Sequence, residues 1–126
     1  MIDRRRLLAA LAAAPAALAV PVAARAHHGW RWTTGELIEL TGVIREARLG
    51  NPHGVLSVQA GDETWTVEVG QPWRNERAGL TDAMLAPGTE AVFLGEPAAD
   101  VSERRLKAVR VTIAGKAHDL YPDRTG

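Results

Sequence analysis

The sequence contains no cysteine, which removes several kinds of chemistry before any motif is considered. Without thiols the chain forms no disulfide and offers no thiolate ligand. Haem attachment through cysteine and iron–sulfur clusters are therefore excluded. Any metal ligands must come from histidine, aspartate, glutamate or a free amino terminus.

Stacking aromatics, an excess of basic charge and enzyme motifs are also scarce. The chain has one Phe, one Tyr, and 15 basic residues against 15 acidic ones. Nucleic-acid binding favours basic patches and stacking aromatics, so the composition argues against a nucleic-acid partner. We find no Ser-His-Asp set, phosphate-binding glycine loop or convincing carboxylate pair, and the sequence therefore leans away from an enzyme.

The first 26 residues have the pattern of a signal peptide. Three arginines at residues 4–6 precede an uncharged stretch, residues 7–24, which Pro15 and Pro21 interrupt. The stretch ends in Ala24-Arg25-Ala26, a small-x-small site that signal peptidase cuts. A membrane-spanning helix needs about 20 strongly apolar residues, which this alanine-rich, proline-broken segment does not offer. We expect export to the periplasm, with no membrane span after processing.

The export route is suggested by the residues around the arginines. Asp3-Arg4-Arg5-Arg6-Leu7-Leu8 resembles the twin-arginine export motif, with Asp and Leu where Ser and Phe are commoner. Three adjacent arginines are equally compatible with the general secretory route.

The processed chain, residues 27–126, is a single small domain. Four of the 15 basic residues and one of the 15 acidic residues leave with the signal peptide, so 11 and 14 remain, a net charge of −3. One hundred residues can bury a modest core. We expect the last six residues to be loose.

Turn residues divide the processed chain into short strands. The clearest strand is residues 63–69, where Trp65, Val67 and Val69 alternate with polar residues. A short helix is predicted from Pro72 to Ala78, between a proline at its start and Gly79 at its end. The other predicted strands are residues 37–47, with Gly42 as a bulge or bend, then 55–60, 90–94 and 105–113, with a short edge at 117–120.

The order of these elements predicts the fold class. Three strands, a short helix and two further strands indicate a mostly β protein, a small OB-like five-stranded barrel. Closure would remove the exposed edges of a small sheet. A small sandwich gives a similar pattern and remains the alternative.

The placement of the four histidines carries the functional hypothesis. His27 and His28 stand at the predicted new terminus, His53 follows Asn51-Pro52 in a turn, and His118 lies near the end. A terminal His27 offers an amine and an imidazole, and a further imidazole completes a set of nitrogens that suits copper. The predicted metal ligands are His27, His53 and His28. Cleavage after Ala24 would instead place His27 third from the terminus, which also binds copper(II).

Simpler interpretations stand beside this one. The two terminal histidines could be a solvated tail, and His53 could simply cap its turn. His118 is not expected to join the site. Glu68 faces away from the apolar side of its strand, and we expect a surface carboxylate rather than a group that supports a ligand. Trp30 and Trp32 are expected to anchor the terminal segment on the barrel.

The chain resembles a family of small bacterial periplasmic proteins classed as a domain of unknown function. The likeness covers most of residues 27–115, and its most specific part is His27-His28 together with Asn51-Pro52-His53. Members usually follow His-His with Ser and an aromatic residue, whereas Gly29-Trp30 stands here. The resemblance implies an exported barrel-like domain and supplies no activity. Two further shared motifs are Trp65-Thr66-Val67-Glu68-Val69-Gly70-Gln71-Pro72 and Leu85-Ala86-Pro87-Gly88.

Two functions remain open from the sequence. The first is a periplasmic protein that binds copper, with a metal ion as its partner and a periplasmic protein as a second candidate partner. The second is a metal-free β-barrel module that binds a protein or a small polar ligand. A copper oxidase acting on sugars is less favoured, because the chain is small and lacks a flat aromatic surface.

Overall fold

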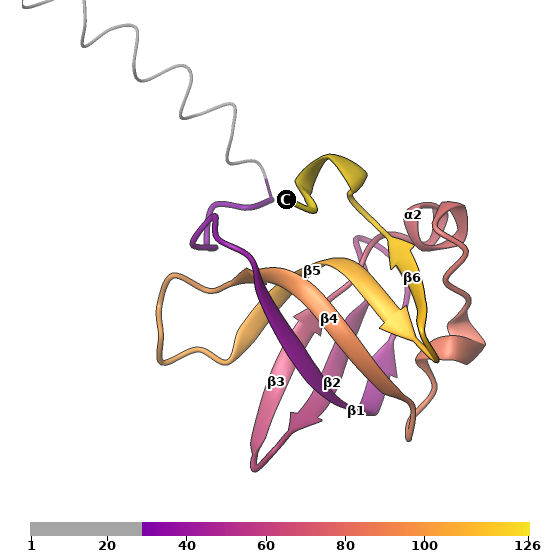
Figure 1. Ribbon diagram of the computed structural model, residues 1–126, viewed down its shortest axis with the longest axis horizontal. Coiled ribbons are helices and arrows are strands. Elements are labelled where there is room, and N and C mark those ends of the chain that lie inside the picture. Colours follow the sequence, from indigo (N-terminus) through magenta and orange to yellow (C-terminus); the bar gives the residue numbers. More distant parts are fainter. Residues whose placement is uncertain (1–28) are drawn as a thin grey trace, which may run out of the picture. The chain divides into compact units, whose positions relative to one another are not determined.

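Six strands and one short helix build the part of the chain that the computed structural model describes, residues 29–126 (Figure 1). The predicted signal peptide and His27-His28 lie outside the described residues. The chain divides into two units after Arg31, and the second, Trp32–Gly126, holds every element discussed below. The strands are β1 (Ile38–Arg48), β2 (Val55–Ala60), β3 (Glu63–Glu68), β4 (Glu90–Pro97), β5 (Arg105–Ile113) and β6 (Lys116–Asp119).

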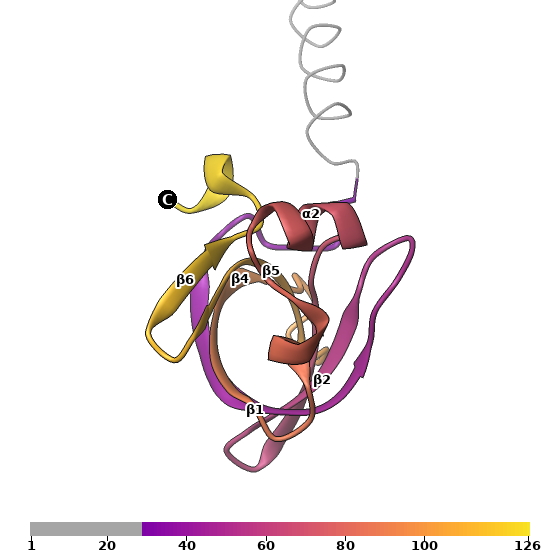
Figure 2. The ribbon, with the colours of Figure 1, turned by 90° about the vertical axis from the view of Figure 1, so that its right-hand side faces the viewer.

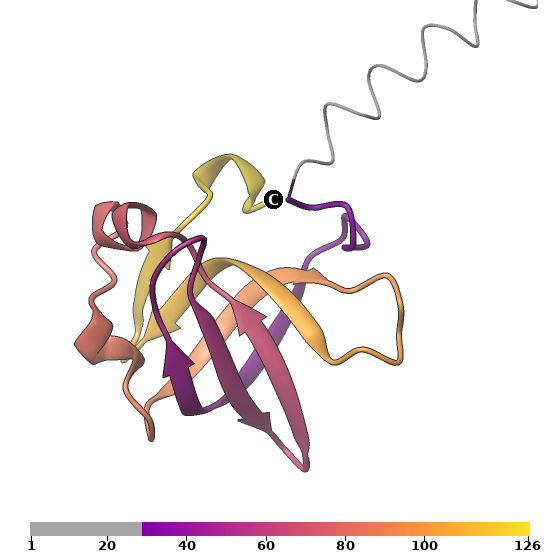
Figure 3. The ribbon, with the colours of Figure 1, turned by 180° about the vertical axis from the view of Figure 1, so that it is seen from behind.

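The predicted barrel is confirmed, because the sheet closes on itself. Antiparallel pairing joins β3 to β2, β2 to β1, β1 to β4 and β4 to β5. A short parallel contact between β3 and β5 completes the ring of five strands, which is visible end-on in Figure 2. β6 pairs with the later half of β5 and lies outside the ring in the same view. Figure 3 shows the barrel from behind, with β2 and β3 toward the viewer.

Alternation along the strands fills the barrel with aliphatic side chains. Phe93, Ile44 and Val67 are fully buried in one core cluster, as their positions in the predicted strands required. Trp65 is only partly buried and packs against the edge of this cluster. The inward face of β3 therefore contributes to the core as expected.

The helix α2 (Pro72–Arg77) follows the third strand, as predicted. Pro72 occupies its first turn, and Gly79 continues the chain beyond its end with a positive φ of 77°, which glycine adopts without a Cβ clash. A 3₁₀ turn, η1 (Asp82–Leu85), follows, and the Thr81 hydroxyl accepts a hydrogen bond from the Met84 amide at 3.4 Å.

The long strand β1 pairs with both β2 and β4, and it bends between the two pairings. The register shift with β2 lies between Ile44 and Glu46, slightly beyond the predicted position at Gly42. Gly42 has a different role. A Cβ built there would lie 2.6 Å from the Gln59 carbonyl oxygen, so the two backbones approach closely only because residue 42 is glycine.

The carboxyl-terminal tail is ordered, contrary to the expectation that it would be loose. Pro122–Arg124 forms a 3₁₀ turn, η2, and the Arg124 guanidinium lies 3.4 Å from a Glu96 carboxylate oxygen. The tail is held because it carries a cation to a buried carboxylate. Within residues 29–126, no helix has the length and apolar character needed to cross a membrane.

Candidate functional site

The pairing of the strands aligns three charged residues in one row on the outside of the barrel. Glu68 on β3 pairs with Lys107 on β5, and Lys107 in turn pairs with Glu96 on β4. Paired residues in neighbouring strands project from the same face of a sheet. The row crosses the parallel contact that closes the barrel, so the fold itself creates this cluster of charges.

Glu68 is the centre of the cluster. Its Oε2 accepts hydrogen bonds from Nε of Arg105, at 3.0 Å, and from Nη2 of the same guanidinium. Its Oε1 lies 3.6 Å from Nζ of Lys107. Only 4% of Glu68 is exposed, so the expectation of a surface carboxylate is wrong. The residue does point outward, but the groups that pair with it also bury it, as a buried charge requires.

His53 reaches the same carboxylate from the loop between β1 and β2. The loop contains a cis peptide bond between Asn51 and Pro52. His53 Nε2 lies 3.1 Å from Oε1 of Glu68, and the His53 side chain remains 30% exposed. His53 therefore does more than cap a turn, because its ring is oriented by a buried group on another strand.

The segment before β1 is fastened to the same place. The Trp32 ring stacks on the Arg105 guanidinium, whose central carbon lies 3.7 Å from the ring centroid. The backbone is tied as well, because the Ala99 amide donates to the Trp32 carbonyl at 2.8 Å and the Thr34 amide donates to the Pro97 carbonyl at 2.9 Å. The predicted anchoring role of Trp32 corresponds to this stack on Arg105.

Glu96 provides a second buried carboxylate at the other end of the row. It is 5% exposed and accepts a hydrogen bond from the Thr33 hydroxyl at 2.7 Å. Arg124 approaches its other oxygen from the tail. The amino-terminal segment and the carboxyl-terminal tail are thus both attached to the same row of charges.

Burial changes the pKa of Lys107, within this row, and of Tyr121. Desolvation lowers the pKa of the Lys107 ammonium below its usual range, and the facing Glu68 carboxylate opposes that shift. Desolvation also raises the pKa of Tyr121, while the Arg74 guanidinium, 4.2 Å from the Tyr121 ring, acts in the opposite direction. Glu68 and Lys107 are 4% and 7% exposed, so the ionic contact between them is stronger than the same contact at an open surface.

The structure places one of the three predicted metal ligands. His53 lies in the Glu68 cluster, whereas His27 and His28 lie outside the described residues. His118 is buried on β6, with Nδ1 3.0 Å from the Ala78 carbonyl oxygen. Among residues 29–126, no group of three or more histidines and carboxylates is arranged to hold a metal ion.

Sequence reasoning missed Arg105 and Lys107, which do most to define the site. Both lie on the outward side of β5, on either side of the buried Leu106. Two basic residues that flank an apolar residue at the start of a strand could have been predicted to lie on its outward face. Their shared contact with Glu68 could not be predicted, because the pairing of β3 with β5 joins segments about 40 residues apart.

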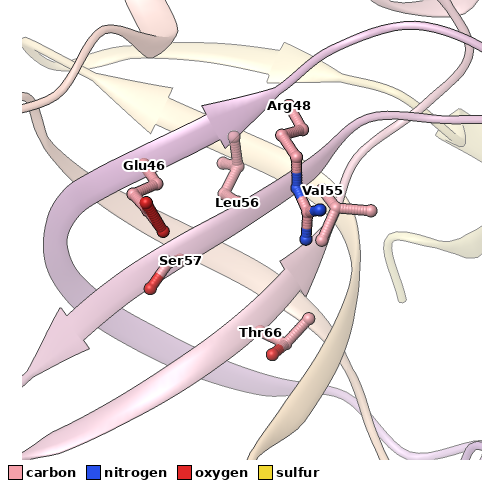
Figure 4. Close-up of a pocket in the computed structure, with 6 residues that line it drawn as sticks. All are labelled: Glu46, Arg48, Val55, Leu56, Ser57 and Thr66. Atoms are coloured by element: carbon pink, nitrogen blue, oxygen red, sulfur yellow. The ribbon is translucent and has the colours of Figure 1, made fainter.

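A polar hollow lies beside the cluster, on the outer face of β1, β2 and β3 (Figure 4). Glu46, Ser57 and Thr66 form a row across the three strands, and the register continues from Thr66 to Arg105. Arg48 extends over Val55 at the other side of the hollow. The hollow offers a carboxylate, a guanidinium and two hydroxyls to a small polar molecule.

Comparison with known proteins agrees with the resemblance noted in the sequence. Residues 16–107 match a family of unknown function, DUF6152. The matched span contains His27-His28, the Asn51-Pro52-His53 turn and the strand that carries Glu68. No curated protein matches the chain.

Proposed function

The chain belongs to the family of unknown function DUF6152, and we propose that it is an exported periplasmic protein that binds copper. The ligands are the processed amino terminus, with His27 and His28, together with His53. The signal peptide, residues 1–26, is removed so that His27 becomes the first residue.

The observation that carries the proposal is a chain of contacts from the amino-terminal segment to His53. Trp32 stacks on Arg105, Arg105 donates to Glu68, and Glu68 faces His53 at 3.1 Å. Trp32, four residues after His28, is thus linked through Arg105 to the carboxylate that faces His53.

The length of the connecting chain is compatible with a shared site. His28 lies four residues before Trp32, so it can extend at most about 14 Å from that anchor along the backbone. His27 lies one residue further away. The proposal requires the shared site to lie within this reach.

The available donor atoms favour copper. An amine and up to three imidazoles form a nitrogen set, and copper prefers imidazole ligands and leads the affinity order of the divalent metals. The chain has no cysteine, and therefore no thiolate ligand that would favour softer metal ions. The Glu68 carboxylate, which faces His53, is already engaged with Arg105 and Lys107, and this disfavours harder metal ions that prefer oxygen ligands.

The test uses protein recovered from the periplasm with its natural terminus, whose intact mass should correspond to a chain starting at His27. Copper(II) should quench tryptophan fluorescence with an end point of one equivalent per chain, because Trp32 lies close to the proposed ligands. His53→Ala should weaken binding at least tenfold. His118→Ala, which changes a buried histidine outside the cluster, is the matched control and should leave affinity unchanged.

A second control isolates the terminal amine. One additional Met before His27 should weaken binding as much as His53→Ala, because it removes the amine–imidazole chelate. If blocked and natural proteins bind copper equally well, or neither binds, the proposal is wrong. The metal-free module would then be the better hypothesis, with the polar hollow around Ser57 as the place to seek a small ligand.

A further inference from the structure

We infer that His53 binds the metal through Nδ1, and that Glu68 is a positioning residue which fixes this choice without touching the metal. This inference rests on the proposed function and adds the atom that coordinates. It also restricts the metal ions that the site would bind to those that form stable complexes with nitrogen ligands alone.

The first step concerns which side chains contact the carboxylate of Glu68. One of its oxygens receives both hydrogen bonds from Arg105, and the other faces Lys107 at 3.6 Å and His53 at 3.1 Å. Both oxygens are therefore engaged. With 4% of the residue exposed, Glu68 cannot turn toward a metal without breaking its hydrogen bonds from Arg105 and its contact with Lys107.

The second step concerns the direction of the hydrogen bond to His53. A carboxylate that is paired with two cations is an acceptor, so the ring must donate, and it does so through Nε2–H. In neutral imidazole the proton on one nitrogen leaves the lone pair on the other. Nδ1 of His53 is the nitrogen that remains available to a metal.

The third step concerns what the arrangement achieves. Histidines that bind metals commonly donate their second N–H to a carboxylate, which fixes the tautomer and increases the basicity of the ligand. Here the carboxylate is itself held by two side chains of β5, so the His53 ring is oriented before any metal arrives. A preorganised imidazole and an occupied carboxylate favour copper over Mg²⁺, Ca²⁺ or Mn²⁺.

The decisive measurement is a long-range proton–nitrogen NMR spectrum of the natural-terminus protein, first without metal and then with silver(I), which is diamagnetic like copper(I) but is not oxidised by air to a paramagnetic ion. The metal-free spectrum should show the His53 proton on Nε2. On addition of silver(I), the Nδ1 resonance should shift strongly while Nε2 keeps its proton. Coordination through Nε2 would overturn the inference while leaving the proposed function intact.

A variant tests the part played by Glu68. Glu68→Gln keeps the size and one acceptor oxygen but loses the charge, and copper affinity should fall about 10- to 100-fold as the tautomer preference weakens. Glu63→Gln is the matched control, since it removes a carboxylate from the same strand in an exposed pair with Arg104. It should change neither the spectrum nor the affinity.

The outcomes separate the two proposals. If copper(II) and silver(I) fail to bind the natural protein, both the function and this inference are wrong. If they bind equally well to wild type and Glu68→Gln, with Nδ1 coordination in both, the positioning role of Glu68 is wrong. Should Glu68→Gln not fold, the wild-type spectra alone still decide which nitrogen of His53 coordinates.

Discussion

At the scale of single residues, the loop between β4 and β5 contains a carboxylate whose acidity is set by one neighbour. Asp100 accepts hydrogen bonds from the Ser102 hydroxyl at 2.7 Å and from the Ser102 amide at 3.0 Å. These bonds favour the ionised form and hold the pKa of Asp100 below its ordinary value of 3.8. The contribution of these hydrogen bonds to the stability of the folded state is present above pH 3.8 and is lost as the pH falls through the lowered pKa of Asp100.

We therefore expect Ser102→Ala to raise the pKa of Asp100 toward 3.8, as measured by an NMR titration of its carboxyl carbon. The larger of the two contributions, the hydroxyl bond, is removed, while the amide bond remains. Ser57→Ala, at a serine in the polar hollow, is the control and should leave the titration unchanged. An Asp100 pKa unaffected by Ser102→Ala would show that the hydroxyl bond is absent in solution.

At the scale of elements, Asn75 joins α2 to the end of β3. Its side chain is 5% exposed; Oδ1 accepts from the Gly70 amide at 2.9 Å, and Nδ2 donates to the Gly70 carbonyl at 3.0 Å. Asn75→Ala should reduce the free energy of unfolding by about 1–3 kcal/mol, because the buried Gly70 amide loses its acceptor. Urea denaturation would measure the loss as a lower midpoint with an unchanged slope.

The exposed Glu76, one residue further along the same helix, provides the comparison. Glu76→Ala should remain within about 0.5 kcal/mol of wild type, since no buried group depends on its side chain. Equal effects of the two substitutions would mean that helix propensity, rather than the Gly70 contacts, determines the result.

The elements also show how far the sequence predicts the structure. Alternation in residues 63–69 and the proline and glycine around α2 are local signals, and both predicted elements are present. The partners of Glu68 depend on a parallel contact between β3 and β5, which no local pattern encodes. The sequence therefore predicts the correct face of the strand for Glu68 but not its burial by Arg105 and Lys107. His27 and His28 lie outside the described residues, so their part in the site stays a prediction.

At the scale of the whole molecule, one core supports the barrel formed by β1 to β5. Phe93 is fully buried within it, and Phe93→Ala should cost about 3–5 kcal/mol through lost burial and an unfilled cavity. Fluorescence and circular dichroism should report the same lowered midpoint, as expected of one cooperative unit. Val101→Ala is the control; its side chain is 81% exposed, and we expect a change within about 0.5 kcal/mol. Midpoints that differ between the two probes would contradict a single cooperative barrel.

The contact that closes the barrel has a consequence for self-association. β3 and β5 share only three paired positions, from Thr66 with Arg105 to Glu68 with Lys107, and separation there would convert the ring into an open sheet. An open sheet exposes unpaired strand edges, which are templates for aggregation. The same separation would break the contacts of Glu68 with Arg105 and Lys107. These ionic contacts therefore oppose the opening of the barrel at the place where its strands are joined by the fewest backbone pairs.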